Sequence, residues 1–300
     1  MAKLPLSACQ PHGMEGPMSH YWRHPALAHL EIRNVEDGRT FSHARHSHST
    51  FSIGAIMQGQ STYLNGDSSR LISAGSVVLM NPGVVHACNP IHDQPWAYRM
   101  FYVDAQWLAD LQQQHSPGKH KGFVPFAQTY SADVSLFDEL DDLYRTLTAS
   151  DCPPNTMQSA TLGFFQRLVA RLQPVSDDAK SEPHKMAQAA KFIREHCADA
   201  LRLEDIASAV QLSPSYLIRA FKACHGLTPH GYLIDCRLKL ARDGLRQGED
   251  IAQVAARVGF ADQAHLQRLF KRALATTPGH YRGVPTQAID TPRSPRAARP

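Results

Sequence analysis

The sequence is poor in cysteine, and its cysteines are not spaced as a metal or redox motif. Its six cysteines lie at positions 9, 88, 152, 197, 224 and 236. None of them are paired as in a zinc ribbon or a thioredoxin-like motif. This excludes a zinc site built on paired thiolates and predicts reduced, inert thiols rather than disulfides.

Long hydrophobic runs are also missing. No apolar stretch approaches the roughly 18 residues that a membrane helix needs. Residues 1–25 lack the basic start and apolar centre of a signal peptide. We therefore expect a cytoplasmic protein that does not engage a membrane.

The net charge is small and unevenly placed. The chain carries +4 overall, but residues 176–300 hold 19 Lys and Arg against 13 Asp and Glu, whereas residues 1–175 hold 12 against 14. The excess of +6 in the second part suits contacts with phosphate without indiscriminate adhesion. This distribution separates a basic part, which suits nucleic acid, from a slightly acidic one.

A chain of 300 residues exceeds the usual size of one domain, so two are expected. The stretch from Gln173 to Pro183 is polar and bracketed by prolines, which predicts a linker over 174–184. The ends, 1–24 and 284–300, are rich in Pro, Ala, Arg and Ser, and we expect a disordered arm and tail there.

The first domain, over 25–130, has the pattern of a β structure. Short apolar runs are separated by turn residues, and Asn65-Gly66 is a strong hairpin signal. The runs cover residues 51–57, 61–64, 70–72, 75–80 and 96–103. Many short strands at regular spacing favour a sandwich or barrel.

Residues 131–173 have the periodicity of helices. One apolar stripe is formed by Leu136, Leu140, Leu143, Leu147, Thr161, Phe165, Leu168 and Leu172, and it is widened by Phe137, Tyr144, Phe164 and Val169. One face is expected to pack on the β domain. The wider stripe leaves enough apolar surface for two protomers to share, which predicts a dimerisation segment.

The second domain contains a pattern written twice, 49 residues apart. Arg219-x-Phe221-Lys222 followed by Thr228-Pro229-x-x-Tyr232 returns as Arg268-x-Phe270-Lys271 followed by Thr277-Pro278-x-x-Tyr281. The same offset aligns the candidate helix caps Ser213 and Asp262, and it places Ala207 on Ala256. A repeat of this kind is one supersecondary unit used twice.

Each copy is predicted to be a helix, a tight turn and a second helix. In the first copy an amphipathic helix over 203–210 precedes one over 213–224, with Ser213 as N-cap and Gly226 as C-cap. A long helix from Thr228 to about Gln247 follows. The second copy places its helices over 250–258 and 262–272.

The outward face of the second helix in each unit carries Arg and Lys at matching positions. A single basic face is commonly just a solvated one, but its duplication at fixed spacing favours DNA. Gln suits adenine edges and Arg suits guanine. At about 1.5 Å per residue, the long central helix could hold two readers about one turn of DNA apart.

The second copy closely resembles the signature of the arabinose-regulator (AraC/XylS) family of bacterial transcription regulators. The matching residues run from Ile251-Ala-x-x-Ala255 through Val258-Gly259-Phe260 to Thr277-Pro278-Gly279-x-Tyr281-Arg282. The resemblance covers about residues 186–283 and implies a DNA-binding domain over 185–283. It also implies a homodimer and contact with RNA polymerase. Ala275 departs from the pattern, because a glycine is usual there.

The resemblance assigns roles by matching position. The implied base-reading residues are Ser215, Ile218 and Arg219 in the first unit and Gln263, Ala264, Gln267 and Arg268 in the second. Lys222 and Lys271 are expected to meet phosphate.

In the first domain, His46-x-His48 and the later Pro82-Gly83-x-x-His86 resemble the two motifs of the cupin barrel, a common sensor in this family. We expect a small-molecule effector at His46, His48, His86, Tyr63 and Trp96. Three histidines could hold zinc in principle. The carboxylate usual in metal-binding cupins is missing between His48 and Gly59, so no metal and no cofactor are expected. The aromatic residues could alternatively be ordinary core.

These observations predict an α+β protein of two domains, an N-terminal cupin-like β-barrel with trailing helices and a C-terminal all-α double helix-turn-helix. The predicted function is sequence-specific, effector-controlled regulation of transcription at a double-stranded DNA operator, without enzymatic activity. Two alternatives stay open: a metal-dependent cupin enzyme, such as a dioxygenase or isomerase, fused to a DNA-binding module, and an architectural DNA protein. The sequence does not decide between activator and repressor.

Overall fold

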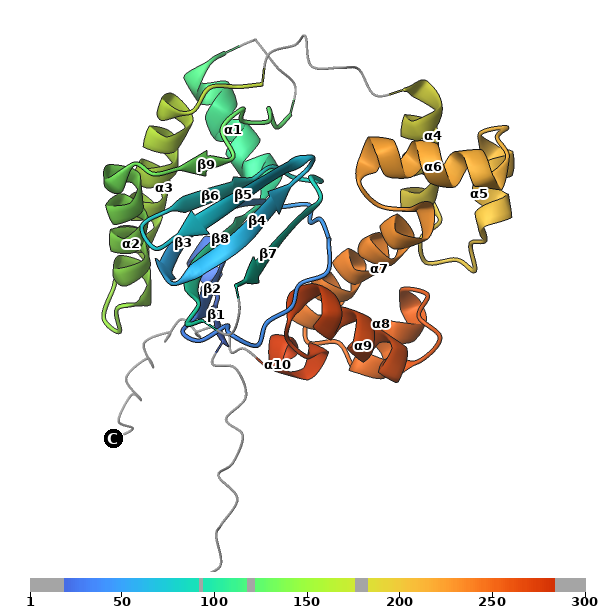
Figure 1. Cartoon of the computed structure of the whole chain (residues 1–300). Coiled ribbons are helices and arrows are strands. Elements are labelled where there is room, and N and C mark those ends of the chain that lie inside the picture. Colours follow the sequence, from blue (N-terminus) through green and yellow to red (C-terminus); the bar gives the residue numbers. More distant parts are fainter. Residues whose placement is uncertain (1–18, 92–93, 118–121, 176–182, 284–300) are drawn as a thin grey trace, which may run out of the picture.

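The computed structural model describes residues 19–91, 94–117, 122–175 and 183–283. Two antiparallel sheets, a short 3-10 helix (Pro25–Leu27) and three α-helices form an N-terminal lobe, and a second, all-helical lobe lies beside it (Figure 1). This confirms the predicted two-domain α+β architecture. The predicted tail and most of the predicted linker lie outside the described residues.

The N-terminal lobe contains nine strands in the described residues. They are β1 (Ser19–Trp22), β2 (Leu30–Val35), β3 (Phe51–Gln58), β4 (Gln60–Asn65), β5 (Ser68–Ser73), β6 (Val77–Met80), β7 (His86–Pro90), β8 (Ala97–Val103) and β9 (Tyr130–Ser131). One sheet has the order β1-β2-β8-β3-β6-β9 and the other β5-β4-β7, with antiparallel pairing throughout. The five predicted runs correspond to β3, β4, β5, β6 and β8.

The prediction of a disordered arm over 1–24 was wrong for its last part. Residues 19–22 form β1, which pairs with β2 in register from Ser19 with Val35 to Trp22 with Ile32. Tyr21 packs in the hydrophobic cluster of the helical domain, and Arg23 donates to Glu31 and to the carbonyl of Tyr281. These partners are distant in sequence, so local composition could not reveal them. Residues 1–18 lie outside the described part of the chain.

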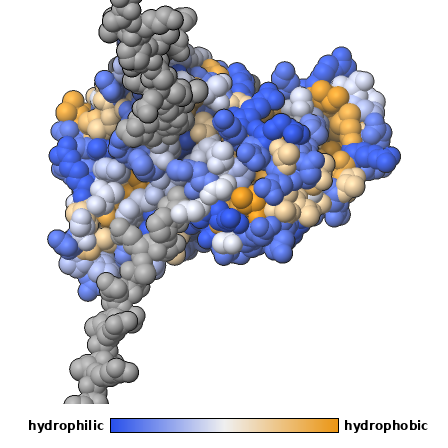
Figure 2. All heavy atoms as spheres, turned by 90° about the horizontal axis from the view of Figure 1, so that it is seen from below, coloured by the Kyte–Doolittle hydropathy of each residue, from blue (hydrophilic) through white to orange (hydrophobic). Residues whose placement is uncertain are grey.

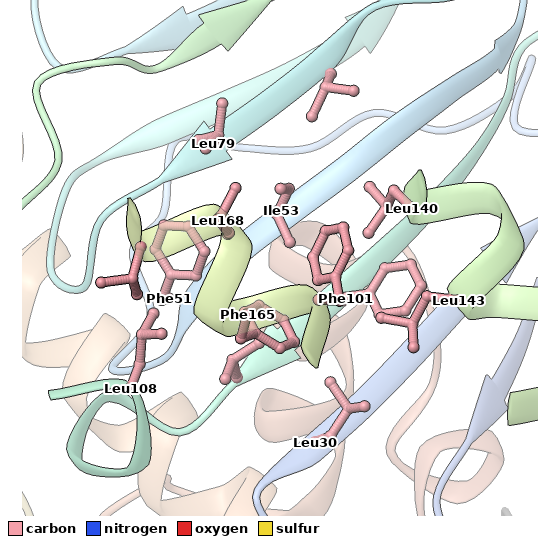
Figure 3. Packing of buried hydrophobic residues seen from close by; sticks show 14 of the residues in the cluster. Leu30, Phe51, Ile53, Leu79, Phe101, Leu108, Leu140, Leu143, Phe165 and Leu168 are labelled. Carbon is pink, nitrogen blue, oxygen red and sulfur yellow. The ribbon is translucent and has the colours of Figure 1, made fainter. Parts of the chain in front are cut away.

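Three helices cover the larger sheet: α1 (Ala105–His115), α2 (Val134–Thr148) and α3 (Pro154–Arg171). Leu140 and Leu143 of α2 and Phe165 and Leu168 of α3 point toward Phe101 and its neighbours on the sheet (Figure 3). The predicted leucine stripe is therefore the seam between helices and sheet, and its burial removes apolar surface from water.

The residues expected to widen that stripe for a partner are largely used within the chain. Phe164 and Val169 belong to the same buried cluster, and Phe137 and Tyr144 are partly buried against it. Val134 and Leu162 remain the large exposed apolar side chains on these two helices. Packing on the sheet thus accounts for most of the apolar pattern.

The C-terminal lobe contains seven helices in the described residues. They are α4 (His184–Glu195), α5 (Leu203–Ala209), α6 (Pro214–His225), α7 (Pro229–Arg246), α8 (Ile251–Arg257), α9 (Gln263–Leu274) and α10 (Pro278–Arg282). Helix α7 joins two clusters, one around α5 and α6 and one around α8 and α9. The five helices predicted from the repeat are present with ends within about two residues.

The two lobes are in contact. The lower part of α7, the end of α9 and α10 lie against the end of the sheets near β1 and β2 (Figure 1). Seen from below, the surface is mainly hydrophilic, with hydrophobic residues in separate patches (Figure 2). Over the described residues, no helix combines the length and apolarity needed to cross a membrane.

Candidate DNA interface and effector pocket

Helices α6 and α9 are each fixed at their N-terminus by a side-chain cap. The hydroxyl of Ser213 accepts from the amide of Tyr216, and the carboxylate of Asp262 accepts from the amide of His265 at 2.6 Å. Such caps satisfy amides that have no partner within the helix. The apolar sides, Leu217 with Phe221 and Leu266 with Phe270, are fully buried. The orientation of each helix about its axis is thereby set.

That orientation leaves the predicted DNA-contacting side chains at the surface. Exposed residues are Ser215, Arg219, Lys222, Gln263, Ala264, Gln267, Arg268 and Lys271, and Ile218 is half-buried. Each helix therefore presents one polar and basic face, in matching positions of two successive helix-turn-helix units. Their contact with DNA stays a prediction.

The two units do not follow one offset along their whole length. Ala207 and Ala255 are buried, whereas Ala256 is exposed. The turns repeat the same hydrogen bonds 48 residues apart, Leu212 amide to Ala207 carbonyl and Phe260 amide to Ala255 carbonyl. The expected match of Ala207 with Ala256 was wrong, because the second unit has one additional residue between its turn and its recognition helix.

The recognition helices end differently in the two units. Gly226 ends α6 with φ 72°, and Ala275 ends α9 with φ 50°, both in the left-handed region. Glycine adopts this conformation at little cost, whereas a side chain with a Cβ is strained there. The residue that departs from the family pattern therefore sits in the conformation that explains the usual glycine.

A cavity lies between the two sheets at the end that faces the helical domain. It is lined by Arg33, His43, His46, His48, Ile56, Met80, His86, Cys88, Trp96, Tyr98, Met100, Tyr102, Ala273 and Leu274. We call it the histidine pocket. Four of the five predicted effector residues, the three histidines and Trp96, line it. Its last two residues come from the C-terminal end of α9, so the second recognition helix forms part of the wall.

Tyr63, the fifth predicted effector residue, lies in the core of the sheets. It is 2% exposed, and its hydroxyl donates to the carbonyl of Leu79 at 2.7 Å. Its burial in the cluster with Ile72 and Trp96 is that of an ordinary core aromatic. An effector contact by Tyr63 would require this hydrogen bond to be replaced.

The histidines of the pocket are held in one tautomer by backbone carbonyls. The Nδ1 atoms of His46, His48 and His86 lie 2.8, 2.9 and 2.8 Å from the carbonyls of Ala44, Thr50 and Val84. A carbonyl can only accept, so each Nδ1 carries the hydrogen, and in the neutral ring Nε2 is an acceptor. Burial, followed by the nearby ring of His46, lowers the pKa of His86 to about 3. The rings are therefore neutral at pH 7.

The rings lie close together but do not form a metal cage. The His86 ring centroid is 4.6 Å from those of both His46 and His48, whereas His46 and His48 are 6.2 Å apart. Within the residues that the structure describes, no group of three or more His, Cys, Asp or Glu side chains could hold a metal ion. The expectation that the site holds no metal stays a prediction.

Residues that sequence reasoning missed connect the pocket to the helical domain. Nη1 of Arg33 donates to the carbonyl of Leu274 at 2.8 Å, and Nδ1 of His43 lies 3.1 Å from the carbonyl of Ala273. Both acceptors are free carbonyls at the end of α9, where a cation is favourably placed. The only sequence signal for these contacts was the alternation of charged and apolar residues in β2. That pattern did not indicate that the charged side chains face the other domain.

A second group of contacts joins the domains beside the pocket. Glu31, 2% exposed, accepts from Arg23 at 2.7 Å and from Arg242 at 3.2 Å. Burial opposes ionisation of Glu31, but Arg242 and Arg23 outweigh it and hold the pKa of its carboxyl below the usual value. Nearby, the carboxylate of Asp235 accepts from the amide and hydroxyl of Ser47. Helix α7 is thus tied to the β domain at two points.

Both domains match known families. Residues 31–164 match the AraC-like ligand binding domain, and residues 206–283 match a helix-turn-helix domain. The chain belongs to the AraC family. It is thus an AraC-family transcription regulator, with an effector-binding N-terminal domain and a helix-turn-helix DNA-binding domain.

Its AraC-family relatives support this membership along the chain. The HTH-type transcriptional activator RhaS of Klebsiella pneumoniae is 25% identical over 248 residues, covering 79% of this chain and 86% of RhaS. The regulatory protein PocR of Salmonella typhimurium is 36% identical over 166 residues, which is 51% of this chain and 55% of PocR. RhaS is a transcriptional activator and PocR is a regulatory protein.

The same architecture occurs in solved structures. Wild-type ToxT from Vibrio cholerae, crystallised with an unsaturated fatty acid, superposes with a TM-score of 0.52 at 14% identity. The match covers 91% of this chain and 96% of ToxT. At this identity the likeness shows the two-domain fold alone.

Proposed function

We propose that this AraC-family regulator reads its operator with the exposed faces of α6 and α9. Direct readout is assigned to Arg219 and Arg268, which suit guanine, and to Gln263 and Gln267, which suit adenine. Ser215, Ile218 and Ala264 add smaller contacts, and Lys222 and Lys271 bind phosphate. The observation that carries this assignment is the matched exposure of these faces in two capped units.

The central helix sets the spacing of the two readers. Helix α7 runs from Pro229 to Arg246, 18 residues, or about 27 Å at 1.5 Å per residue. It packs against both α4 and α10, so it acts as a rigid spacer. Two recognition helices held in this way suit adjacent major-groove segments on one face of DNA.

The histidine pocket is proposed as the effector site. It lies in the β domain, which we describe as cupin-like, and its wall includes Ala273 and Leu274 of α9. A ligand that binds differently when α9 is docked and when it is released shifts the balance between these arrangements. The ligand thereby changes how the DNA-binding units are placed.

The remaining assignments rest on the family and the sequence. We propose that the regulator acts in the cytoplasm as a homodimer, with RNA polymerase as a further partner. The exposed Leu162 of α3 is a suitable point for the dimer contact. A dimer would present four recognition helices and gain avidity. Size-exclusion chromatography with light scattering measures the oligomeric state directly.

We propose no enzymatic activity. A metal-dependent cupin enzyme would purify with about one metal ion per chain and lose it as the histidines are protonated. Elemental analysis of the purified protein distinguishes that alternative.

Genome-wide mapping of bound DNA in cells that express the protein tests the main proposal. A few sharp peaks with repeated half-sites are expected, and the Arg268→Ala variant should give weaker peaks with a relaxed preference at one base. Even binding to unrelated DNA would instead support an architectural protein.

A further inference from the structure

Arg33 is a buried cation without a counter-ion. Its side chain is 1% exposed, and none of the ion pairs among the described residues involves it. Nε donates to the hydroxyl of Ser19 and Nη1 to the carbonyl of Leu274, both neutral acceptors. Nη2 is buried with no hydrogen-bond partner. A buried charge is costly unless it is paired, so this guanidinium is prepared for an anion.

The comparison with Arg23 shows a buried arginine whose charge the chain neutralises with a carboxylate of its own. Arg23, 7% exposed, also donates to a backbone carbonyl of the helical domain, that of Tyr281. It differs because the carboxylate of Glu31 lies 2.7 Å from its Nε. Arg23 is therefore neutralised within the chain. Arg33 lines the pocket with no carboxylate against it, and its guanidinium lies over the rings of Tyr21 and Phe41, 5.3 and 5.2 Å from their centroids.

The rest of the pocket defines what else a ligand must offer. His46 and His86 use Nδ1 on the backbone, so their Nε2 atoms are available as acceptors and favour a ligand that donates. The other walls, including Ile56, Met80 and Trp96, are apolar. The complementary molecule has an apolar body, an acidic end and a hydroxyl or similar donor.

The cavity is too small for such a molecule as it stands. Its volume is about 40 Å³, room for only a few water molecules. Ala273 and Leu274 close it from the side of the helical domain. A carboxylate that pairs with both terminal nitrogens of Arg33 also competes with the Leu274 carbonyl for Nη1. Entry of the ligand therefore requires the end of α9 to move.

We propose that the effector is a small organic acid whose carboxylate pairs with Arg33 in the histidine pocket, in place of the carbonyl of Leu274. This rests on the proposed function of the pocket as the effector site. The chain supplies the counter-charge, the two ring acceptors and the apolar walls. The ligand supplies the missing anion and separates α9 from the β domain.

Thermal unfolding of the full-length protein tests the ligand class. The probes are butanoate, hexanoate, benzoate and phenylacetate, their hydroxylated counterparts, and the primary amide of each acid, at about 10 mM. At least one acid is expected to raise Tm by about 2–4 °C. Its amide, which has the same shape without the charge, should have little effect.

Three variants locate the effect. Arg33→Gln should abolish the response to the acid, and Arg33→Lys, which keeps the charge, should restore part of it. Arg237→Gln is the matched control, because Arg237 is a buried arginine that donates to backbone carbonyls within the helical domain and does not line the pocket, and it should retain the full response. Ile56→Trp fills the cavity and should remove the response to the acid. Circular dichroism confirms that each variant is folded before the ligand is added.

Two results would overturn the proposal while leaving the pocket as the effector site. One is equal stabilisation by acids and amides; the other is a response that survives Arg33→Gln but is removed by Ile56→Trp. A response that survives Ile56→Trp would contradict the pocket itself, and with it the proposed route of control. No response to any of the acids would also overturn the proposal, and operator binding measured separately would show whether the regulator still functions.

Discussion

The hydroxyl of Tyr281 donates a 3.0 Å hydrogen bond to Glu31, 250 residues away in the sequence. Tyr281 belongs to α10 of the DNA-binding domain and Glu31 to β2 of the sensor domain. Arg23 and Arg242 approach the same carboxylate. A single buried acid thus holds residues of both domains in one group.

Replacing that acid should loosen the contact between the domains. Glu31→Gln leaves the guanidinium groups of Arg23 and Arg242 buried without an anion, and a loss of about 3 kcal/mol in the free energy of unfolding is expected. Hydrogen exchange should rise at the amides of α7 and α10. Glu139→Gln is the control, because Glu139 also meets two arginines but lies within one domain and is more exposed. Equal effects of the two variants would argue against a coupling role for Glu31.

Arg268 and Lys271 should affect DNA binding in different ways. Arg268→Ala is expected to weaken operator binding by about 1–3 kcal/mol and to relax the preference at one base. Lys271→Ala should weaken binding to all sequences and reduce the salt dependence by about one ion. Titrations of operator variants at several salt concentrations measure both. If Arg268→Ala weakened every sequence equally, its role as a base reader would be wrong.

Stability should fall as the pH drops below about 6.5, because neutral pocket histidines resist protonation. In the unfolded chain a histidine takes up a proton near that pH, whereas burial lowers the pKa of His86 to about 3 in the folded protein. The unfolded state then binds more protons, at a cost of about 1.4 kcal/mol per pH unit for each such histidine. His86→Gln should flatten the slope between about pH 6 and pH 4 by this amount.

Denaturant unfolding at several pH values measures that slope. His230→Gln replaces an exposed histidine and serves as the control. An unchanged slope in His86→Gln would mean that this ring is protonated in the folded protein.

The end of α9 should tolerate glycine better than the native residue. Ala275 has φ 50°, so Ala275→Gly relieves strain and is expected to raise the free energy of unfolding by about 0.5–1 kcal/mol. Gly226→Ala at the matching end of α6 should lower the free energy of unfolding by a similar amount, because Gly226 also has a positive φ. An added Cβ meets only ordinary contacts there, so backbone strain is the only cost. Chemical denaturation of both variants measures the two changes in the free energy of unfolding, which should have opposite signs. Stabilisation by Gly226→Ala would contradict the backbone explanation.

The repeat could be predicted from sequence because its determinants are local. Ser213 and Asp262 cap helices whose buried and exposed faces follow the helical period. The outward position of Arg219 and Arg268 could therefore be predicted from the sequence. The short strands after Phe51 were likewise marked by turns. The alignment of the two turns could not be predicted in the same way. The second unit has one extra residue before Asp262, so Ala255, rather than Ala256, corresponds to Ala207.

The contacts between the domains could not be predicted, since each depends on a partner far along the chain. Glu31 and Arg33 alternate with apolar residues as in a strand with one solvated face. They are buried only because α7, the end of α9 and α10 lie over them. His46, His48 and His86 carried a recognisable motif, whereas Arg33 had none.

Helix α7 has a consequence for building chimeric regulators. The helix separates α6 from α9, the two proposed recognition helices. It also carries Asp235, Lys239 and Arg242, which contact Ser47 and Glu31 of the sensor domain. A DNA-binding domain transplanted from a relative would bring its own α7 and lose these matched partners. Such a hybrid could recognise its operator and yet no longer respond to the effector, unless the sensor-facing side of α7 were transplanted back with the sensor.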